Sequence, residues 1–233
     1  MAAHIPKDLS KFEVEEFYSC FNVNFIGTVN LLEAVAESES GTARFVYASS
    51  ASVYGRGVFE VPIGEDNLCP QNYYAESKLL GEVYLQRFSQ KAGFSYAILR
   101  YSSVYGSGMK ENSVLPIFLS RAQKSGTLKV QGSGRRSQDF VYVDDVVEAA
   151  LKAGLAKKSG IYNIGSGFET TMLELAKTVI SVVGHGKINF NQNKDEVVDE
   201  TEFFLDIGRS RRELKYSPKF TLVEGLAKMH HGR

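Results

Sequence analysis

Tyr74 and Lys78 are the two residues of this chain whose spacing most directly suggests chemistry. They stand four positions apart in the run Tyr-Ala-Glu-Ser-Lys, so on a helix they share one face, about one turn apart. An ammonium group held beside a phenol stabilises the phenolate and lowers the pKa of tyrosine from ~10 toward neutrality. Such a tyrosine can act as a general acid or base. Because one pair with this spacing is also expected by chance, the neighbouring segments must decide between a site and a surface pair.

Two hydroxyl-rich segments accompany that pair. Residues 45–55 read Phe-Val-Tyr-Ala-Ser-Ser-Ala-Ser-Val-Tyr-Gly, which predicts a buried strand with serines at its carboxyl end. Residues 99–106 read Leu-Arg-Tyr-Ser-Ser-Val-Tyr-Gly and end the next strand in a similar way. Since open α/β sheets bind their ligands at the carboxyl ends of the strands, these hydroxyl groups are predicted to lie beside a ligand.

The elements that would position these residues alternate between helix and strand. Helical spacing predicts one long helix over 14–38 and a second over 73–91 that stops at Gly93. Apolar runs predict buried strands at 44–49 and 95–100. This order predicts an α/β protein with a Rossmann-like, doubly wound parallel sheet.

Beyond residue 107 the pattern predicts a smaller α/β lobe, interleaved with the last strands of the main sheet. Its expected helices are 113–124, 144–156 and 170–183, and its expected strands are 128–131, 139–143, 161–164 and 187–191. The acidic run 195–202 is predicted to be a solvated loop, and the tail that contains His230 and His231 is predicted to be disordered.

The composition excludes several classes of partner. The 233 residues include 27 basic and 27 acidic side chains, so the formal net charge is zero, and neither a nucleic acid nor a membrane surface is an expected partner. The two cysteines, Cys20 and Cys69, are far apart, and the four histidines lack metal-ligand spacing. Apolar runs stay well short of the ~20 residues that a membrane span needs. We therefore expect a cytoplasmic protein without a metal site.

In these segments the chain resembles the extended short-chain dehydrogenase/reductase superfamily, in its NAD-dependent epimerase/dehydratase branch. Ser-Ser-Ala-Ser-Val-Tyr-Gly at 49–55 is similar to the family's catalytic Ser/Thr segment, and Tyr74 with Lys78 is similar to its Tyr-x-x-x-Lys pair. Further similar segments follow the family order: Asn22-Val-Asn24-Phe-Ile-Gly27-Thr28, Asp139-Phe-Val-Tyr-Val-Asp-Asp145, Tyr162-Asn163-Ile164-Gly165 and Arg212-Glu-Leu. Several ordered motifs together are far more specific than any one of them.

The resemblance implies a role for each matching residue. Tyr74 resembles the general acid/base, Lys78 the residue that tunes its pKa and clamps the nicotinamide ribose, and Ser50 the donor that orients the reacting oxygen. The expected cofactor is NAD, with NADP as the alternative, and the expected cofactor-binding residues are Ala2, Ala3, Asn24, Ser49, Tyr74, Lys78, Tyr101 and Val104. The expected substrate-binding residues are Ser52, Ser103, Arg136 and Gln138.

The activity implied by the resemblance is epimerisation of a nucleotide sugar through a transient keto intermediate, with NAD regenerated in each cycle. In the resemblance, Ala51 and Ser52 match the two positions at which the family's dehydratases carry Asp and Glu, and their replacement here disfavours dehydration. Two alternatives remain: an NAD(P)-dependent reductase or dehydrogenase acting on a sugar or another carbonyl compound, and an inactive truncated fragment. Net consumption of NAD(P)H would separate a reductase from an epimerase.

The chain departs from the family at its start. The family opens with a strand and a Gly-x-x-Gly-x-x-Gly turn for the cofactor pyrophosphate, whereas Met1-Ala-Ala-His4 resembles the end of the fourth strand. We therefore interpret 1–106 as the remainder of an NAD-binding Rossmann domain that lacks its N-terminal strands, and 107–233 as mainly the substrate-binding lobe. The hypothesis that follows is poor NAD binding by this chain alone, which micromolar binding in calorimetry would refute.

The substrate side also departs from the family. Nucleotide-sugar epimerases typically carry Asn where this chain has Ser103, and Arg where it has Gln138 and Glu196. Arg135 and Arg136 are candidates to replace one of these phosphate contacts, because arginine binds phosphate in bidentate fashion; two solvated arginines on a turn are the alternative.

Gly81, inside the predicted second helix, indicates either close approach of another backbone or a tight core contact. The resemblance further implies a homodimer formed through the two long helices.

Overall fold

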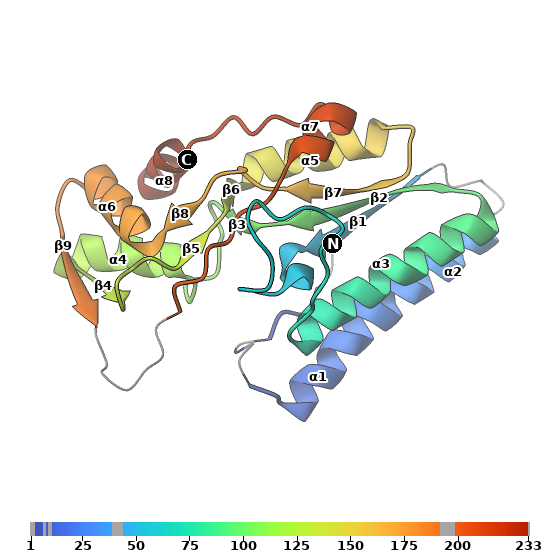
Figure 1. The fold of residues 1–233 in the computed structure, drawn as a ribbon, viewed down its shortest axis with the longest axis horizontal. Coiled ribbons are helices and arrows are strands. Elements are labelled where there is room, and N and C mark those ends of the chain that lie inside the picture. The colour runs from blue at the N-terminus through green and yellow to red at the C-terminus, as the bar shows by residue number, and fades with distance from the viewer. Residues whose placement is uncertain (1–2, 7, 9–10, 39–43, 192–198, 233) are drawn as a thin grey trace.

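A three-stranded parallel sheet lies at the centre of the computed structural model, which describes residues 3–6, 8, 11–38, 44–191 and 199–232 (Figure 1). Strand β2 (Ser95–Tyr101) is the middle strand and pairs in parallel with β1 (Arg44–Ser50) on one side and β7 (Gly160–Ile164) on the other. Side chains of β2 alternate between the two faces and are buried on both: Ala97 and Leu99 contribute to one core cluster and Ile98 to another. The central strand is apolar because helices cover both sides of it.

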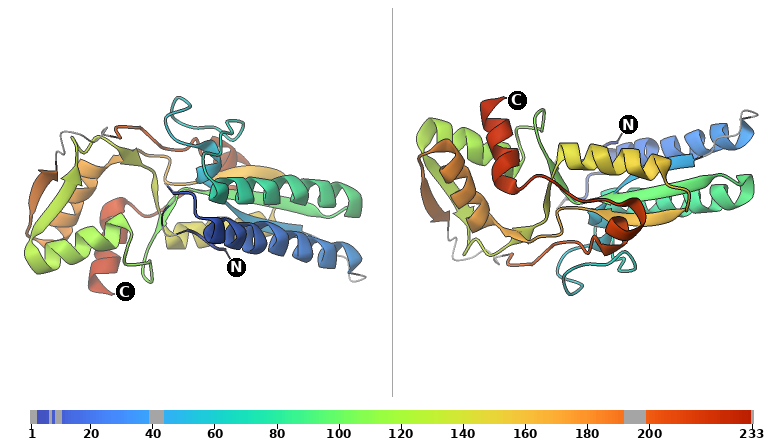
Figure 2. Two further views of the ribbon diagram at one scale, coloured as in Figure 1. Left: turned by 90° about the horizontal axis from the view of Figure 1, so that it is seen from below. Right: turned by 90° about the horizontal axis from the view of Figure 1, so that it is seen from above.

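One face of the sheet is covered by two long helical rods that lie side by side (Figure 2). The first rod consists of α1 (Val14–Cys20), a π-helical turn η1 (Phe21–Ile26) and α2 (Gly27–Glu37). The second is α3 (Tyr73–Ala92), whose N-cap is Asn72: its Oδ1 accepts from the Ala75 amide at 2.9 Å. The opposite face carries α5 (Val143–Leu155) and α7 (Gly208–Leu214). The sheet is therefore doubly wound, as predicted.

A second lobe lies at the other end of the molecule (Figure 1). Its elements are α4 (Val114–Ser125), β4 (Thr127–Gln131), α6 (Met172–Val183), β9 (Lys187–Asn191) and α8 (Leu222–His231), with β4 and β9 paired in parallel. Short strands connect it to the main sheet: β3 (Ser103–Tyr105) pairs with β6 (Phe140–Tyr142), and β5 (Ser137–Gln138) pairs with β8 (Thr170–Thr171). The lobe has its own apolar core, which includes Leu115, Leu128 and Leu175.

Most predicted elements are present within a residue or two of their predicted ends. The interleaving is visible in β7, which follows the second lobe's first elements in sequence yet pairs with β2 in the main sheet. The division of the chain at residue 106 stays a prediction. Within the described part of the chain, no helix is long and apolar enough to cross a membrane.

Two local predictions need correction or a choice between alternatives. The tail is not disordered as far as residue 232: His230 and His231 end α8, and the His230 ring lies 2.9 Å from the Gln123 amide nitrogen. At Gly81 the close neighbour is a side chain, because a Cβ there would lie 2.8 Å from Cζ of Tyr47. The core-contact alternative is therefore correct. Of the acidic run, residues 195–198 lie outside the described residues.

Candidate active site

Ser50 and Tyr74 meet at the carboxyl end of the central sheet. Ser50 is the last residue of β1, and its Oγ accepts from the Ser52 amide at 3.2 Å, which caps the short 3₁₀ helix η2 (Ala51–Tyr54). Tyr74 lies in the first turn of α3, close enough to the Ser50 side chain for that side chain to influence the ionisation of its phenol. Strand end and helix start thus bring together two hydroxyl groups 24 positions apart in the chain.

Burial dominates the acid–base behaviour of Tyr74. The residue is 9% exposed, and loss of solvation raises the pKa of its phenol above the usual value. The Ser50 side chain opposes this rise in the pKa, whereas the nearby Cys20 adds to it. The sequence predicted a pKa lowered by Lys78; in this structure the pKa is raised instead, and the stabilising contact comes from Ser50.

Lys78 lies one turn further along α3 and is 5% exposed. Its Nζ lies 4.8 Å from the centre of the Tyr47 ring, and Tyr47 in turn fills the space beside Gly81. Burial lowers the pKa of Lys78 to about 8, and the negative charge of Glu82 counteracts part of this effect. Lys78 forms no ion pair with the carboxylates of the described residues.

The Glu82 carboxylate belongs to a buried ion pair beneath the site. Arg100 donates from Nη2 to Glu82 Oε2 at 2.6 Å and from Nε to Oε1 at 3.0 Å, and both side chains are 1% exposed. Ser49 donates its hydroxyl to the same carboxylate, and Arg100 also donates to the Tyr54 hydroxyl at 3.2 Å. This network ties β1, η2, β2 and α3 together immediately behind Ser50, which makes the site rigid.

Asn24 lies in the π-helical turn, a local structure that the sequence pattern did not predict. The side chain is 2% exposed, accepts from the His4 amide at 2.8 Å, and donates to the His4 carbonyl at 2.9 Å and to Ser77 Oγ at 3.1 Å. Asn24 therefore holds the first segment of the chain against α3. π-Helical turns of this kind are frequent at functional sites.

A cavity of about 530 Å³ opens in front of Ser50. Its lining comes from η2, the segment before α3, the end of β2 and the second lobe: Ser50, Ala51, Ser52, Gly55, Arg56, Gln71, Asn72, Tyr101, Ser102, Ser103, Arg136, Gln138 and Phe203. All four residues predicted to bind substrate lie in this cavity, together with Ser50 and Tyr101. Among the described lining residues, none carries a carboxylate or an imidazole.

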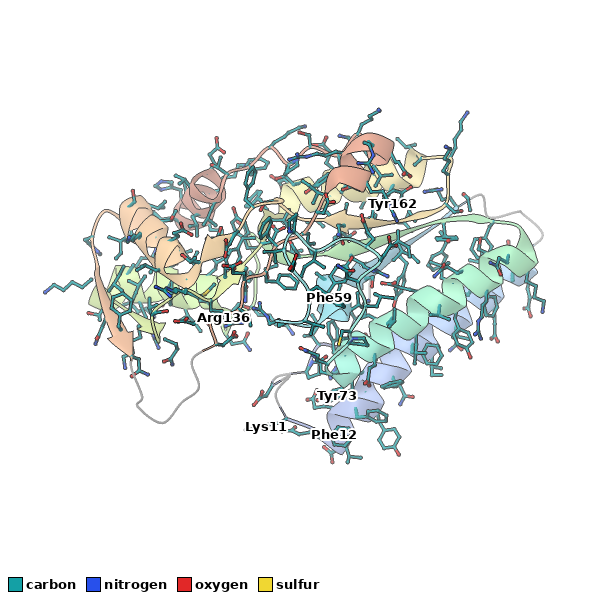
Figure 3. All side chains as sticks on the ribbon, viewed as in Figure 1. Lys11, Phe12, Phe59, Tyr73, Arg136 and Tyr162 are labelled. Atoms are coloured by element: carbon teal, nitrogen blue, oxygen red, sulfur yellow. The ribbon has the colours of Figure 1, made fainter. Side chains whose placement is uncertain are left out.

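Two arginines converge inside this cavity. With the Gln138 amide oriented so that its nitrogen donates to Ser103 Oγ at 3.0 Å, its oxygen accepts from Nη2 of Arg56 and Nη2 of Arg136, each at 3.1 Å. In Figure 3, Arg136 lies between the second lobe and the loop that carries Phe59. The polar half of the cavity is therefore positively charged.

Arg56 and Phe203 are cavity residues that sequence reasoning missed. Arg56 directly follows the matched serine segment, and that proximity was the available signal. Phe203 offered none, because it is brought to the cavity by distant contacts: its amide donates to Ser137 Oγ at 3.0 Å, and the Leu205 amide donates to the buried Asp139 carboxylate at 3.3 Å.

The remaining predicted cofactor residues are dispersed around the site. Ala2 lies outside the described residues, and Ala3 is exposed near the start of the chain. Val104 packs against the core beside the sheet and is not among the residues that line the cavity. The Ser49 hydroxyl is occupied by Glu82. Roles in cofactor binding for these residues stay predictions.

The site carries polar groups that suit a polar ligand. The hydroxyls of Ser52 and Ser102 line the cavity, are buried, and have no hydrogen-bond partner among the described residues. The Lys78 ammonium, on α3, is also buried and forms no ion pair with a carboxylate of the described residues. Because unsatisfied buried polar groups are costly, such groups fit a site that forms hydrogen bonds to a polar ligand.

A doubly wound parallel sheet with polar side chains gathered at the carboxyl ends of its strands is an architecture typical of dinucleotide-binding enzymes. Residues 11–165 match the NAD dependent epimerase/dehydratase family. The chain belongs to this NAD-dependent enzyme family, and the resemblance noted from the motifs is confirmed.

Relatives within the family carry out more than one reaction. The chain is 34% identical over 214 residues to a putative UDP-glucose 4-epimerase of Methanocaldococcus jannaschii, covering 89% of this chain and 68% of the relative. It is 32% identical over 227 residues to the human dTDP-D-glucose 4,6-dehydratase, covering 97% and 61%. The structure is similar to that of UDP-glucose 4-epimerase with UDP-glucose from Thermotoga maritima, with a TM-score of 0.86 and 28% identity, covering 99% and 74%. The chain thus spans between three fifths and three quarters of the lengths of these relatives.

Proposed function

We propose that this chain carries the catalytic site of an NAD-dependent nucleotide-sugar epimerase that acts through a transient keto intermediate. The observation that carries the proposal is the proximity of Ser50, which lines a cavity that also holds two arginines, to Tyr74, whose ionisation it influences, with Lys78 one turn further along α3. Similarity to UDP-glucose 4-epimerases supports the nucleotide-sugar class of substrate.

The roles of the residues follow from their positions. Tyr74 takes a proton from the sugar hydroxyl and later returns it, and Ser50 holds the same oxygen by a hydrogen bond. Bound beside these residues, NAD would supply the hydride acceptor for oxidation of the sugar carbon and, once reduced, the hydride donor for its return. In this proposal Lys78 contributes a positive charge one turn from the phenol, which favours the phenolate during proton transfer. Asn24, Ser49, Tyr101 and Val104 stay our proposed cofactor contacts, together with Ala2 and Ala3.

The wall formed by η2 argues for epimerisation over dehydration. Loss of water from a sugar requires an acid to protonate the leaving hydroxyl group and a base to remove a proton. Ala51 presents only a methyl group and is 3% exposed, and Ser52 presents a hydroxyl. None of the described lining residues carries a carboxylate, so they supply no acid–base pair of the kind that expulsion of water needs.

An assay with UDP-glucose and NAD tests the proposal, on the chain extended at its N-terminus by a family segment that carries the Gly-x-x-Gly-x-x-Gly turn. We expect UDP-galactose to form without net accumulation of NADH; steady accumulation of NADH would favour the dehydrogenase alternative. In that extended chain, Tyr74→Phe should abolish turnover and leave calorimetric NAD binding largely intact. The matched control is Tyr73→Phe, because the neighbouring Tyr73 hydroxyl is buried without a partner among the described residues. A rate near wild type in Tyr74→Phe would remove Tyr74 from the mechanism.

The proposal extends to assembly and location. Apolar side chains are exposed along the first helical rod and the segment before it, namely Phe12, Val14, Tyr18, Val23, Ile26 and Leu31. We propose that they pair two copies of the chain through the two long helices, which equilibrium sedimentation would test.

The free thiols of Cys20 and Cys69 support a reducing, cytoplasmic location, which localisation of the tagged protein would test.

A further inference from the structure

The guanidinium groups of Arg56 and Arg136 lie close together in the cavity, where they place two positive charges. Both guanidinium groups donate to the same Gln138 oxygen, so two like charges lie close together. Like charges repel at short range, and this repulsion is strongest where water is partly excluded. Such an arrangement is typical of a site whose negative partner is a ligand.

The backbone around Arg56 is built to hold this side chain in place. The Gln71 side chain accepts from the Arg56 amide at 3.0 Å and donates to the Arg56 carbonyl at 3.2 Å, so both backbone polar groups are engaged. The preceding Gly55 has φ +70°, and a Cβ there would lie 2.9 Å from Cδ of Gln71. The Arg56 guanidinium stacks 5.2 Å from the centre of the Phe203 ring, and it donates to Thr201 Oγ1 at 3.4 Å.

Charge compensation in the described part of the site is incomplete. Arg136 has Asp199 at 3.0 Å from its Nε, but this nitrogen makes no hydrogen bond of good geometry to a described residue. Arg56 makes no ion pair with a carboxylate of the described residues. Burial and the charge of Arg136 lower the pKa of Arg56 to about 10, so the guanidinium stays charged at neutral pH. One partly exposed carboxylate therefore faces two cations.

The ligand chemistry that matches this group is a diphosphate. Each guanidinium can bind two phosphate oxygens in a planar, bidentate fashion, and two of them side by side suit two linked phosphates. Ser50 lines the same cavity, so a diphosphate at the arginines would place an attached sugar toward the catalytic hydroxyls.

We propose that Arg56 is a substrate-binding residue that, together with Arg136, binds the diphosphate of the nucleotide sugar, and that this diphosphate displaces Asp199 from Arg136. The inference rests on the proposed function for the identity of the substrate. It assigns to Arg56, from a different segment of the chain, the phosphate contact that an arginine at position 138 would otherwise provide.

Calorimetric titration of the full chain with UDP, repeated with dTDP, tests the proposal without cofactor or turnover. Arg56→Gln and Arg136→Gln should each weaken binding about 10- to 100-fold, as expected for loss of a charge-assisted pair. Arg135→Gln is the matched control, because the Arg135 side chain is 78% exposed and lies 3.9 Å from the Glu200 carboxylate. The nucleotide affinity of this variant should equal that of the wild-type chain. Asp199→Asn should tighten binding, because it removes the competing carboxylate.

Several outcomes would overturn the inference. These are wild-type affinity in Arg56→Gln, an equal loss in Arg135→Gln, or failure of the wild-type chain to bind either nucleotide. Thermal unfolding of each variant checks folding, and Arg56→Lys, which keeps the charge but loses the planar fork, should bind with intermediate affinity. If binding depends on Arg56 but no epimerisation is detected, the proposed function fails while this inference stands. If epimerisation occurs and Arg56→Gln leaves the KM for the sugar nucleotide unchanged, the inference alone fails.

Discussion

The Lys78 ammonium lies over the ring of Tyr47, 4.8 Å from the ring centre. The two residues come from α3 and β1, and they meet because Gly81 leaves room for the tyrosine ring beneath the helix. The negative face of the ring offers partial compensation for a charge that burial has deprived of water. This contact links the packing of the helix on the sheet to the electrostatics of the site.

The first prediction concerns how stability depends on pH. Burial lowers the pKa of Lys78 to about 8 in the folded chain, against 10.5 for an ordinary lysine. Between these values the unfolded chain binds more protons, so the free energy of unfolding should increase as pH rises from about 8 to 10.5. Relative to Lys78→Met, wild type should gain on the order of 3 kcal/mol across this range in urea unfolding. Lys91→Met, exposed on the same helix, should show no such trend.

Gly81 gives a second prediction, on packing. Gly81→Ala should destabilise the chain by about 1–3 kcal/mol, since its Cβ would overlap the Tyr47 ring. In a Tyr47→Leu background the same substitution should cost clearly less, because the ring is gone. Additive costs in this double-mutant cycle would show that the two residues do not interact.

The buried ion pair gives a third prediction. Glu82→Gln leaves the charge of Arg100 buried without its carboxylate, and we expect a loss of about 3–5 kcal/mol in the free energy of unfolding. Glu76→Gln, an exposed position on the same helix, should change it by less than about 0.5 kcal/mol. A loss in Glu82→Gln as small as in the control, measured by denaturant titration, would contradict the importance of this pair.

A fourth prediction tests the π-helical turn. Asn24→Ala removes hydrogen bonds to both backbone groups of His4 and to Ser77, and should cost about 2–3 kcal/mol. Hydrogen exchange at the His4 amide should become faster, because its acceptor is lost. Asn22→Ala, exposed in the same turn, should leave both quantities unchanged. Unaltered protection of His4 in Asn24→Ala would show that the segment is held by other contacts.

The sequence by itself was enough to predict the main elements and the chemical groups. Apolar runs and helical spacing identified β1, β2, α3 and α5, because local periodicity records which face of an element is buried. Tyr74 and Lys78 were found from their types and spacing, and Ser50 from its matched motif. The resemblance to the family supplied the substrate candidates Ser52, Ser103, Arg136 and Gln138. All four of the latter line one cavity.

Tertiary structure alone decided what surrounds these groups. The raised pKa of Tyr74 depends on burial, which spacing along one helix does not report. The pairing of Glu82 with Arg100, and the approach of Phe203 to the cavity, join segments that are distant in sequence. Arg56 lies beside Arg136 because the loop that follows η2 packs against the second lobe, a contact between segments far apart in the chain. Local patterns encode which side chains exist and which face they occupy, whereas solvation and charge at a site depend on contacts between remote segments.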